Sequence, residues 1–559
     1  MHKDITAIIL VTMLSAISIP TTATIYGIKY LNEVLSFPHD LESLGLFANL
    51  ILTSGFTGLL FGLFAHLLYY KALKKAYLVV IFLLSLLLTA VEVFCLAKFG
   101  LSISSTICMM IADTNTSEMA DFFQMYFDIF TLMVVMGISI IGYLLWRLSG
   151  VIYRFVADYK KLFFTVFVML VIFSLAGVKK IGGYNVSPPI IKTFHGVKYF
   201  LKVRRRIAKM SSDKTNRTEL TADRSDTPHI VFIIGESASK HFMGIYNNRY
   251  DSTPYAQKLV DSKNMFVFTD TISMKSTTLE AMTLLLSFME NTTETTDIAK
   301  FDSIIDVFKK ANYQTFWLSN QAKTTRDFFY AEYVSNRCDY TTFVAKASGN
   351  LENIASLVST DEALLLPLDN YLNHQAMQKE KNFFILHLMA SHFTYSLRYP
   401  ESFNRFQGSD IQNTELTSKQ KQLVAEYVNT LYYTDYLLNE IISRFKDKDA
   451  ILIYVPDHAE ELWQSGYLGH GAKNLSKYML EIPMLIWVSD IYKTKRLDNI
   501  KRVENALNKP FMTDNLVHVL LDLAGIETKQ YDPSKSVINE AYVPRERLIN
   551  RIRYEDLRE

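Results

Sequence analysis

Five apolar segments in the first 180 residues place the strongest limit on how this chain can fold. Each is near the length of about 20 residues that an α-helix needs to cross a bilayer. The segments are Ile5–Tyr26, Leu44–Leu68, Tyr77–Ala97, Phe122–Trp146 and Leu162–Val178. No clear small-residue cleavage site follows the first segment, so we interpret it as a retained helix. Residues 1–180 are therefore predicted to form a transmembrane domain of five helices.

The charges between these segments predict their orientation. The loops after the second and fourth segments are basic, with Lys71, Lys74, Lys75, Arg147, Arg154, Lys160 and Lys161. The other two loops are acidic, with Glu33, Asp40, Glu42, Asp113, Glu118 and Asp121. Basic loops stay in the cytoplasm, so five crossings place everything after about Gly177 on the outer face of the membrane.

Composition narrows the possible functions. The 58 basic and 56 acidic residues leave a net charge of +2, which argues against a nucleic-acid binder driven by bulk charge. The three cysteines, Cys95, Cys108 and Cys338, are too few for a disulfide framework and do not indicate a redox compartment.

Residues 181–228 are predicted to be an amphipathic bridging linker. Phe194–Met210 mixes apolar residues with Lys198, Lys202, Arg204, Arg205, Arg206 and Lys209. Such a segment suits an anionic membrane surface. A solvated helix that only connects two domains is the alternative.

The rest of the chain, residues 229–559, has the pattern of an α/β domain. Strand-like runs recur at His229–Ile234, Met265–Thr269, Gln314–Leu318, Asn382–Leu388, Ala450–Val455 and Pro483–Val488. Helical patterns such as Asp302–Ala311 and Ser418–Phe445 lie between them. This alternation predicts a mostly parallel sheet covered on both faces.

Acidic and histidine side chains follow two of these strands. Asp457 and His458 come directly after the apolar run that starts at Ala450, and Glu236 follows the run that starts at His229. Ligands gather at the carboxyl ends of strands in open α/β sheets, and carboxylate with imidazole suits zinc. Hydrogen-bonded loop residues are the alternative interpretation.

A hydroxyl-rich segment, Ser273–Thr278, precedes the apolar run Ala281–Phe288 and has the signature of a helix start. A threonine hydroxyl there becomes a competent nucleophile when a metal or base lowers its pKa. Helix capping alone is the other role open to these residues. Among the histidines, His387 lies inside a strand and is expected in the core, whereas His392 and His470 lie on loops, where either a functional or a structural role fits.

Together these motifs resemble the membrane-anchored phosphoethanolamine transferases of the alkaline phosphatase and sulfatase superfamily. The resemblance covers nearly the whole chain and rests on Ile234–Ser237, Ser273–Thr278, Ser391-His392, Pro456–Glu460 and Gly469–Gly471. It implies a membrane domain of five helices followed by an α/β/α catalytic domain like that of alkaline phosphatase.

The resemblance also implies roles for individual residues. Glu236, Thr278, Asp457 and His458 would bind one zinc ion, with Thr278 as the nucleophile. His392 and His470 would line the site, where they bind a second zinc ion or the substrate phosphate. Lys323 matches more loosely, as a contact of the phosphoryl group. The outward loop Thr114–Glu118 also matches, with Thr114 and Glu118 as contacts of the donor head group. Met110 stands where the family has an asparagine at the donor site.

Two departures bear on the branch of the family. Members that modify lipid A, including those linked to polymyxin resistance, have disulfides in the outer domain, and one of them brackets the nucleophile where this chain has Met274 and Leu284. The usual Ser-Asp-His-Gly-Glu is Pro-Asp-His-Ala-Glu here, from Pro456 to Glu460. The chain therefore resembles more closely the disulfide-poor branch that decorates the lipopolysaccharide core.

The expected function is zinc-dependent transfer of phosphoethanolamine from phosphatidylethanolamine to lipopolysaccharide, through a phosphothreonine-type intermediate. A core sugar or heptose phosphate is the favoured acceptor, and lipid A is possible. The enzyme would be a multi-pass protein of the bacterial inner membrane with its catalytic domain in the periplasm.

The sequence leaves three alternatives open: a phosphoglycerol transferase, a related phosphohydrolase, and a membrane transporter or sensor with an outer binding domain. A phosphoglycerol transferase or a related phosphohydrolase would share the fold, whereas a sulfatase would need a modifiable Cys or Ser at the position of Thr278. A transporter or sensor would carry more ionisable residues in its membrane helices than His66, Glu92 and Asp128.

Overall fold

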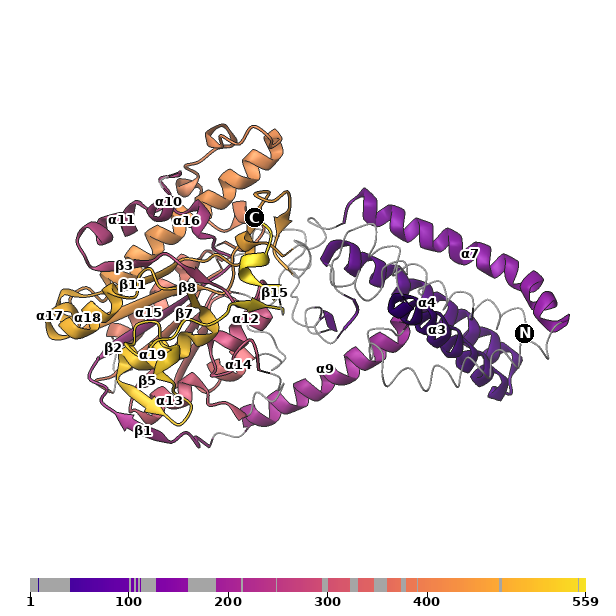
Figure 1. The fold of residues 1–559 in the computed structure, drawn as a ribbon, viewed down its shortest axis with the longest axis horizontal. Helices are drawn as coiled ribbons and strands as arrows, with labels where there is room; N and C mark the ends of the chain where they lie inside the picture. The colour runs from indigo at the N-terminus through magenta and orange to yellow at the C-terminus, as the bar shows by residue number, and fades with distance from the viewer. Residues whose placement is uncertain are drawn as a thin grey trace. The chain divides into compact units, whose positions relative to one another are not determined.

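The computed structural model divides into two compact units (Figure 1). It describes residues 9, 41–99, 102–104, 107–108, 111, 127–158, 188–212, 215–247, 249–293, 300–321, 330–345, 359–373, 379–389, 391–471, 475–550 and 552–559. Among these, the residues up to Val203 belong to the first unit and those from Arg204 onward to the second.

Within the described residues, the first unit contains the long helices α3 (Leu41–Leu67), α4 (Lys71–Phe99) and α7 (Ile129–Asp158). Two of them hold stretches long and apolar enough to cross a membrane, Lys71–Lys98 and Thr131–Ile152. The helices α4 and α7 pack together, with the rings of Phe82 and Trp146 edge to face at a centroid distance of 4.7 Å. The first and fifth predicted segments lie outside the described residues apart from Ile9, so the number of five crossings stays a prediction.

Helix α7 differs from its predicted form at its end. Arg147 and Arg154 lie inside the helix, which continues to Asp158, and not in a loop as predicted. Apolar residues such as Leu148 and Val151 continue on the exposed surface of the helix beyond Trp146. Long basic side chains can extend from such a helix end to a polar surface, so they do not terminate it.

The predicted linker region contains regular structure. Helix α9 spans Pro189–Ser212, with proline at its first position, where a missing N–H costs nothing. Strand β1 (Leu220–Asp223) pairs antiparallel with β13 (Ile526–Thr528) in the second unit.

A seven-stranded sheet forms the centre of the second unit. Its order is β3 (Met265–Phe268), β11 (Met484–Val488), β8 (Ala450–Pro456), β2 (His229–Gly235), β7 (Asn382–His387), β5 (Gln314–Ser319) and β6 (Tyr340–Phe343). Every neighbouring pair is parallel except the two that involve β11. All six predicted strands form, and the sheet is mostly parallel as predicted. Strand β6 was not predicted, because four half-buried residues carry little apolar signal.

Helices cover both faces of this sheet, which is why its central strands are apolar on both sides. On one face, Val231 and Ile233 of β2 share a core with Tyr427 and Leu431 of α16 (Ser418–Ser443). On the other face, Phe308 of α13 (Ile304–Lys310) stacks on Phe383 of β7 at 3.9 Å between ring centroids.

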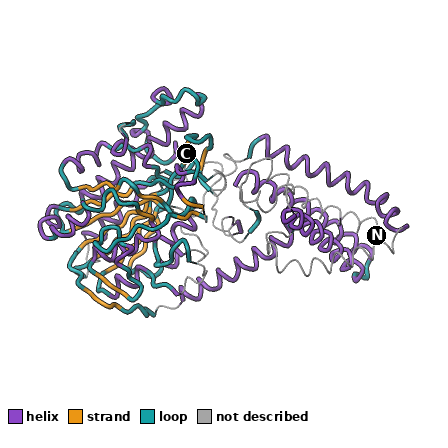
Figure 2. Tube along the Cα trace, viewed as in Figure 1, coloured by secondary structure: helices purple, strands orange, loops and turns teal. Residues whose placement is uncertain are grey.

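Shorter elements complete the second unit, and within the described residues all strands lie there (Figure 2). The other helices are α10 (Gly244–Asn247), α11 (Pro254–Asp261), α12 (Thr278–Leu285), α14 (Tyr330–Ser335), α15 (Leu365–Asn373), α17 (Asp490–Lys495), α18 (Leu497–Glu504) and α19 (Leu516–Ala524). The other strands are β4 (Thr271–Ile272), β9 (Glu461–Leu462), β10 (Leu468–Gly469), β12 (Phe511–Met512), β14 (Leu548–Ile549) and β15 (Ile552–Arg553).

Candidate active site

Strand register brings the two predicted acidic positions together. The parallel pair of β2 and β8 ends with Gly235 opposite Pro456, so Glu236 and Asp457 leave the sheet side by side at its carboxyl edge. The backbone N–H of Asp457 donates to the carbonyl of Gly235 at 3.1 Å, which extends the ladder by one more bond. Two strands distant in sequence therefore aim their polar ends at one point.

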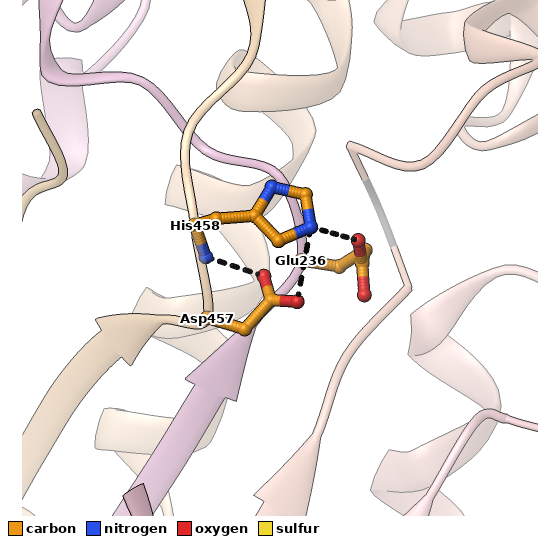
Figure 3. A group of neighbouring side chains, drawn as sticks. All are labelled: Glu236, Asp457 and His458. Atoms are coloured by element: carbon orange, nitrogen blue, oxygen red, sulfur yellow. Dashed lines mark hydrogen bonds and ion pairs between the residues drawn. The ribbon is translucent and has the colours of Figure 1, made fainter. Parts of the chain in front are cut away.

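Glu236, Asp457 and His458 form a compact buried cluster whose side chains point toward one another (Figure 3). One ligand atom from each lies within 4.8 Å of the others. His458 Nε2 is 3.3 Å from Asp457 Oδ2 and 3.7 Å from Glu236 Oε1. All three residues are almost fully buried.

The imidazole of His458 directs a lone pair into this cluster. Its Nδ1 lies 3.0 Å from the carbonyl oxygen of Ala459, which can only accept, so Nδ1 carries the proton. Burial first, and then the neighbouring His470, lower the pKa of His458 to about 3, so the ring is neutral. Its unprotonated Nε2 thus faces carboxylate oxygens, which are also electron donors.

Such a set of donors is costly to bury without a cation. Burial raises the pKa of both carboxyls, and the neighbouring Asp457 carboxylate raises that of Glu236 further. Asp457 Oδ2 is buried and finds no hydrogen-bond donor of normal geometry among the described residues. Two carboxylates and a neutral imidazole nitrogen are ligands that suit zinc, so these residues fit a metal ion.

Thr278 adds a hydroxyl to the cluster. Its Oγ1 lies 3.2 Å from His458 Nε2, and 3.3 and 3.4 Å from the two carboxylate oxygens of Glu236. The cap of helix α12 is Thr277, so Thr278 is the first helical residue and its hydroxyl does not cap the helix. The capping interpretation therefore does not explain Thr278.

His470 and His392 lie close to this cluster. The rings of His470 and His458 are 4.2 Å apart between centroids, and His470 Nδ1 is 2.9 Å from Glu460 Oε2. Burial lowers the pKa of His470, but the carboxylates of Glu460 and, to a smaller extent, Asp457 together more than offset this, and the net pKa is raised. Burial and then Arg398 lower the pKa of His392 to about 3, with smaller effects from His470 and His458.

The family model of the sulfatases matches residues 228–526, which is more than half of the chain. The chain belongs to the sulfatase family. The matched region contains the buried cluster, Thr278 and both site histidines.

Proteins named phosphoethanolamine transferases are also similar to this sulfatase-family chain. It is 23% identical over 481 residues to the phosphoethanolamine transferase EptC of Escherichia coli strain K12, and the match covers 79% of each chain. The periplasmic domain of Escherichia coli EptC, in a crystal structure of its complex with Zn, shares the fold with a TM-score of 0.52 and 24% identity, over 61% of this chain and 96% of that one.

A membrane-embedded protein matches over almost the whole length. The integral membrane protein lipooligosaccharide phosphoethanolamine transferase A from Neisseria meningitidis has a TM-score of 0.59 at 16% identity, covering 95% of this chain and 97% of that one. The predicted resemblance to phosphoethanolamine transferases is thus confirmed, and so is the sulfatase-like fold of the second unit.

Three predicted site residues of this sulfatase-family chain cannot be placed. Lys323, Thr114 and Glu118 lie outside the described residues, and their roles stay predictions. His387 is buried as predicted, with Nδ1 3.1 Å from Ser319 Oγ, but its Nε2 has no partner among the described residues.

Three supporting residues were not predicted. Ser237 binds both carboxylates, with its N–H 3.1 Å from Asp457 Oδ1 and its hydroxyl 2.8 Å from Glu236 Oε1. Ser273 Oγ lies 2.6 Å from the Asp457 carbonyl and so fixes the start of the Thr278 segment. Glu460 holds His470. All three lie in the motifs that carry the family resemblance, but no role was assigned to them from the sequence.

Proposed function

We propose that this protein transfers phosphoethanolamine from phosphatidylethanolamine to lipopolysaccharide through a phosphothreonine at Thr278. The observation that carries the proposal is the Thr278 hydroxyl, which lies within 3.2 to 3.4 Å of His458 and Glu236 without capping its own helix. The named activity of EptC and the fold shared with lipooligosaccharide phosphoethanolamine transferase A from Neisseria meningitidis support phosphoethanolamine as the transferred group.

The metal site of this proposal consists of Glu236, Asp457, His458 and Thr278. Zinc is the ion we propose, because the donor set suits it and the related EptC domain was crystallised in complex with Zn. When bound there, zinc lowers the pKa of the threonine hydroxyl and offsets charge on the phosphoryl oxygens.

In the first step, Thr278 Oγ1 attacks the phosphorus of the donor lipid, and the bond from phosphorus to the glycerol oxygen breaks. The hydroxyl proton passes to Glu236, which has two oxygens at 3.3 and 3.4 Å. His470, held by Glu460, supplies a proton to the departing diacylglycerol. Backbone N–H groups at the start of α12 are available to the phosphoryl oxygens.

In the second step, a hydroxyl or phosphate oxygen of the acceptor attacks the same phosphorus. The bond to Thr278 Oγ1 breaks, and the threonine takes back a proton. His392 and His470 are placed to move protons for the entering and leaving oxygens. By the resemblance, we propose Lys323 as a further contact of the phosphoryl group.

The donor is a membrane lipid, so the proposal includes membrane anchoring. We propose five membrane helices in the bacterial inner membrane and a periplasmic second unit. We also propose that Thr114 and Glu118, just before the fourth predicted membrane segment, contact the donor head group. The core of lipopolysaccharide is the acceptor we favour, because none of the three cysteines forms a disulfide and Met274 and Leu284 are buried where the lipid A-modifying branch has one.

Trapping of the intermediate tests this function. The purified full-length protein is incubated with labelled phosphatidylethanolamine, or with labelled phosphatidylglycerol, and no acceptor. Mass spectrometry should find a phosphoethanolamine adduct on the peptide that contains Thr278. A phosphoglycerol adduct instead would change the transferred group, and an adduct on Thr277 or Ser276 would change the nucleophile.

A further inference from the structure

Helix α9 is held to the first unit by one of its faces. Lys192 Nζ lies 2.6 Å from both Glu92 Oε1 and Ser102 Oγ, and the Lys192 side chain is only 3% exposed. One turn later, a Cβ added at Gly196 would lie 3.0 Å from the carbonyl oxygen of Ser104, so the helix approaches that segment closely. This face of α9 is fixed by an ion pair and by close packing.

The opposite face of α9 exposes a continuous row of five residues, which we call the exposed stripe. It consists of Phe194, Val197, Lys198, Leu201 and Lys202, at the spacing that aligns side chains on one side of a helix. Phe194 is 63% exposed, Val197 41% and Leu201 37%. Both lysines are exposed too.

A connecting helix in water has no need of this arrangement. A solvated face carries charged side chains, whereas here three large apolar side chains point outward next to two lysines. Within the described part of the chain, neither lysine is paired with a carboxylate. The exposed stripe therefore offers an apolar surface and two available positive charges, on a helix attached to the unit that holds the candidate membrane spans.

We propose that the exposed stripe lies in the membrane interface and binds the head groups of anionic phospholipids. The rings and aliphatic groups would enter the boundary between head groups and acyl chains, while the lysine stems bring the ammonium groups to the lipid phosphates. Anionic lipids provide the charge that complements Lys198 and Lys202. This inference depends on the proposed membrane anchoring but not on the transfer reaction.

The depth of a spin label tests the inference in the full-length chain. Cys95, Cys108 and Cys338 are replaced by Ala, a nitroxide is attached at Leu201→Cys, and the protein is placed in bilayer discs of phosphatidylethanolamine with or without phosphatidylglycerol. With phosphatidylglycerol, the label should collide mainly with oxygen, and without it mainly with a water-soluble nickel chelate. Lys198→Glu with Lys202→Glu should restore nickel collisions even when phosphatidylglycerol is present.

A matched variant controls for charge. Lys419→Glu with Lys446→Glu makes the same charge change on exposed lysines of the second unit and should leave the label depth as it is. If the double glutamate variant of α9 fails to fold, Lys198→Gln with Lys202→Gln replaces it and should give an intermediate depth. A label that stays in water in both bilayers, or that is equally immersed whatever the lipid charge, overturns the proposal.

Discussion

At the residue scale, Thr278 and Thr277 have different surroundings although they are adjacent. Thr278 faces His458 and Glu236, whereas the hydroxyl of Thr277 faces Glu280 at 3.3 Å on the exposed side of the same helix start. This contrast makes Thr277 an internal control for Thr278, because both sit at the start of α12.

We expect Thr278→Ala to abolish transfer, because among the described residues Thr278 Oγ1 is the hydroxyl that lies within hydrogen-bond distance of both His458 Nε2 and Glu236. Its free energy of unfolding should change by only about 1 kcal/mol, as for the loss of one hydroxyl contact at a helix start. Thr277→Ala should keep most of the activity. Product formation and thermal unfolding of both variants check this. Equal losses of activity would show that helix geometry matters here and not the nucleophile.

Single residues also show where prediction from sequence stopped. Asp457, His458 and Glu236 were identified because each follows an apolar strand-like run. Ser237 was not assigned a role, because its contribution depends on a left-handed backbone (φ 53°) that turns its N–H toward Asp457. Sequence patterns indicate where a strand ends but do not predict such local backbone geometry.

At the element scale, the close approach of β2 and β8 leaves no room for a side chain at Gly235. A Cβ at this position would lie 2.6 Å from the hydroxyl oxygen of Tyr454 and 2.9 Å from two of its ring atoms. Tyr454 is buried, so its ring cannot simply move into solvent. A larger residue at 235 must therefore displace either the ring or the strand end that carries Glu236.

Gly235→Ala should lower the free energy of unfolding by about 1–3 kcal/mol, the usual range for overpacking a buried site. It should also weaken metal binding, because Glu236 is the next residue. Adding Tyr454→Leu removes the ring atoms that the new Cβ meets and should recover part of both losses. Chemical unfolding and metal titration measure them. No recovery in the double variant would mean that the ring is not the obstacle.

Helix α19 contains a buried histidine, His518, that lies outside the candidate site and affects how stability depends on pH. His518 Nδ1 accepts the N–H of Asp532 at 3.2 Å, which requires the neutral ring. Burial first, and then Lys535, lower the pKa of His518 to about 4. The unfolded chain has a histidine pKa near 6.5, so between these values it binds a proton that the folded chain does not.

The stability from His518 is therefore fully present above about pH 6.5 and is lost as the pH falls toward 4. His518→Asn keeps an acceptor for the N–H of Asp532 but cannot titrate. The variant should therefore lose up to about 3 kcal/mol less of its free energy of unfolding than the natural chain between about pH 6.5 and 4. Thermal unfolding at neutral and mildly acid pH tests it. The free energy of unfolding should still depend on pH to some extent, because the pKa of His229 is also lowered to about 4, mainly by burial. A slope identical to that of the natural chain would contradict the assignment.

At the scale of the whole molecule, the second unit was more predictable than the first. Central strands that are buried on both faces have nearly continuous apolar sequences, which is why all six could be predicted. The predicted end of α7 was wrong. Apolar and basic side chains occur together in that helix, so composition alone does not show where it ends. Which loops reach the site also depends on chain segments far apart in sequence.

The proposed metal site would link ion binding to the stability of the whole second unit, because Glu236 and Asp457 end the two neighbouring strands at the middle of its sheet. Without a cation, two buried carboxylates repel each other and face the lone pair of His458. An ion bound at the proposed site would reverse this, because a ligand present at about a thousand times its Kd adds about 4 kcal/mol to the free energy of unfolding.

Asp457→Asn should therefore have opposite effects with and without zinc. In chelator, the variant should unfold at a higher temperature than the natural chain, by the equivalent of about 1 kcal/mol or more, since one carboxylate of the repelling pair is gone. With zinc, it should unfold at a lower temperature, because a ligand is lost. Asp435→Asn also alters a buried carboxyl, one that accepts the N–H groups of Tyr255 and Ala256, and should leave the zinc-dependent shift intact. A full zinc shift in Asp457→Asn would exclude Asp457 as a ligand. A less stable variant in chelator would show that the carboxylate pair does not repel.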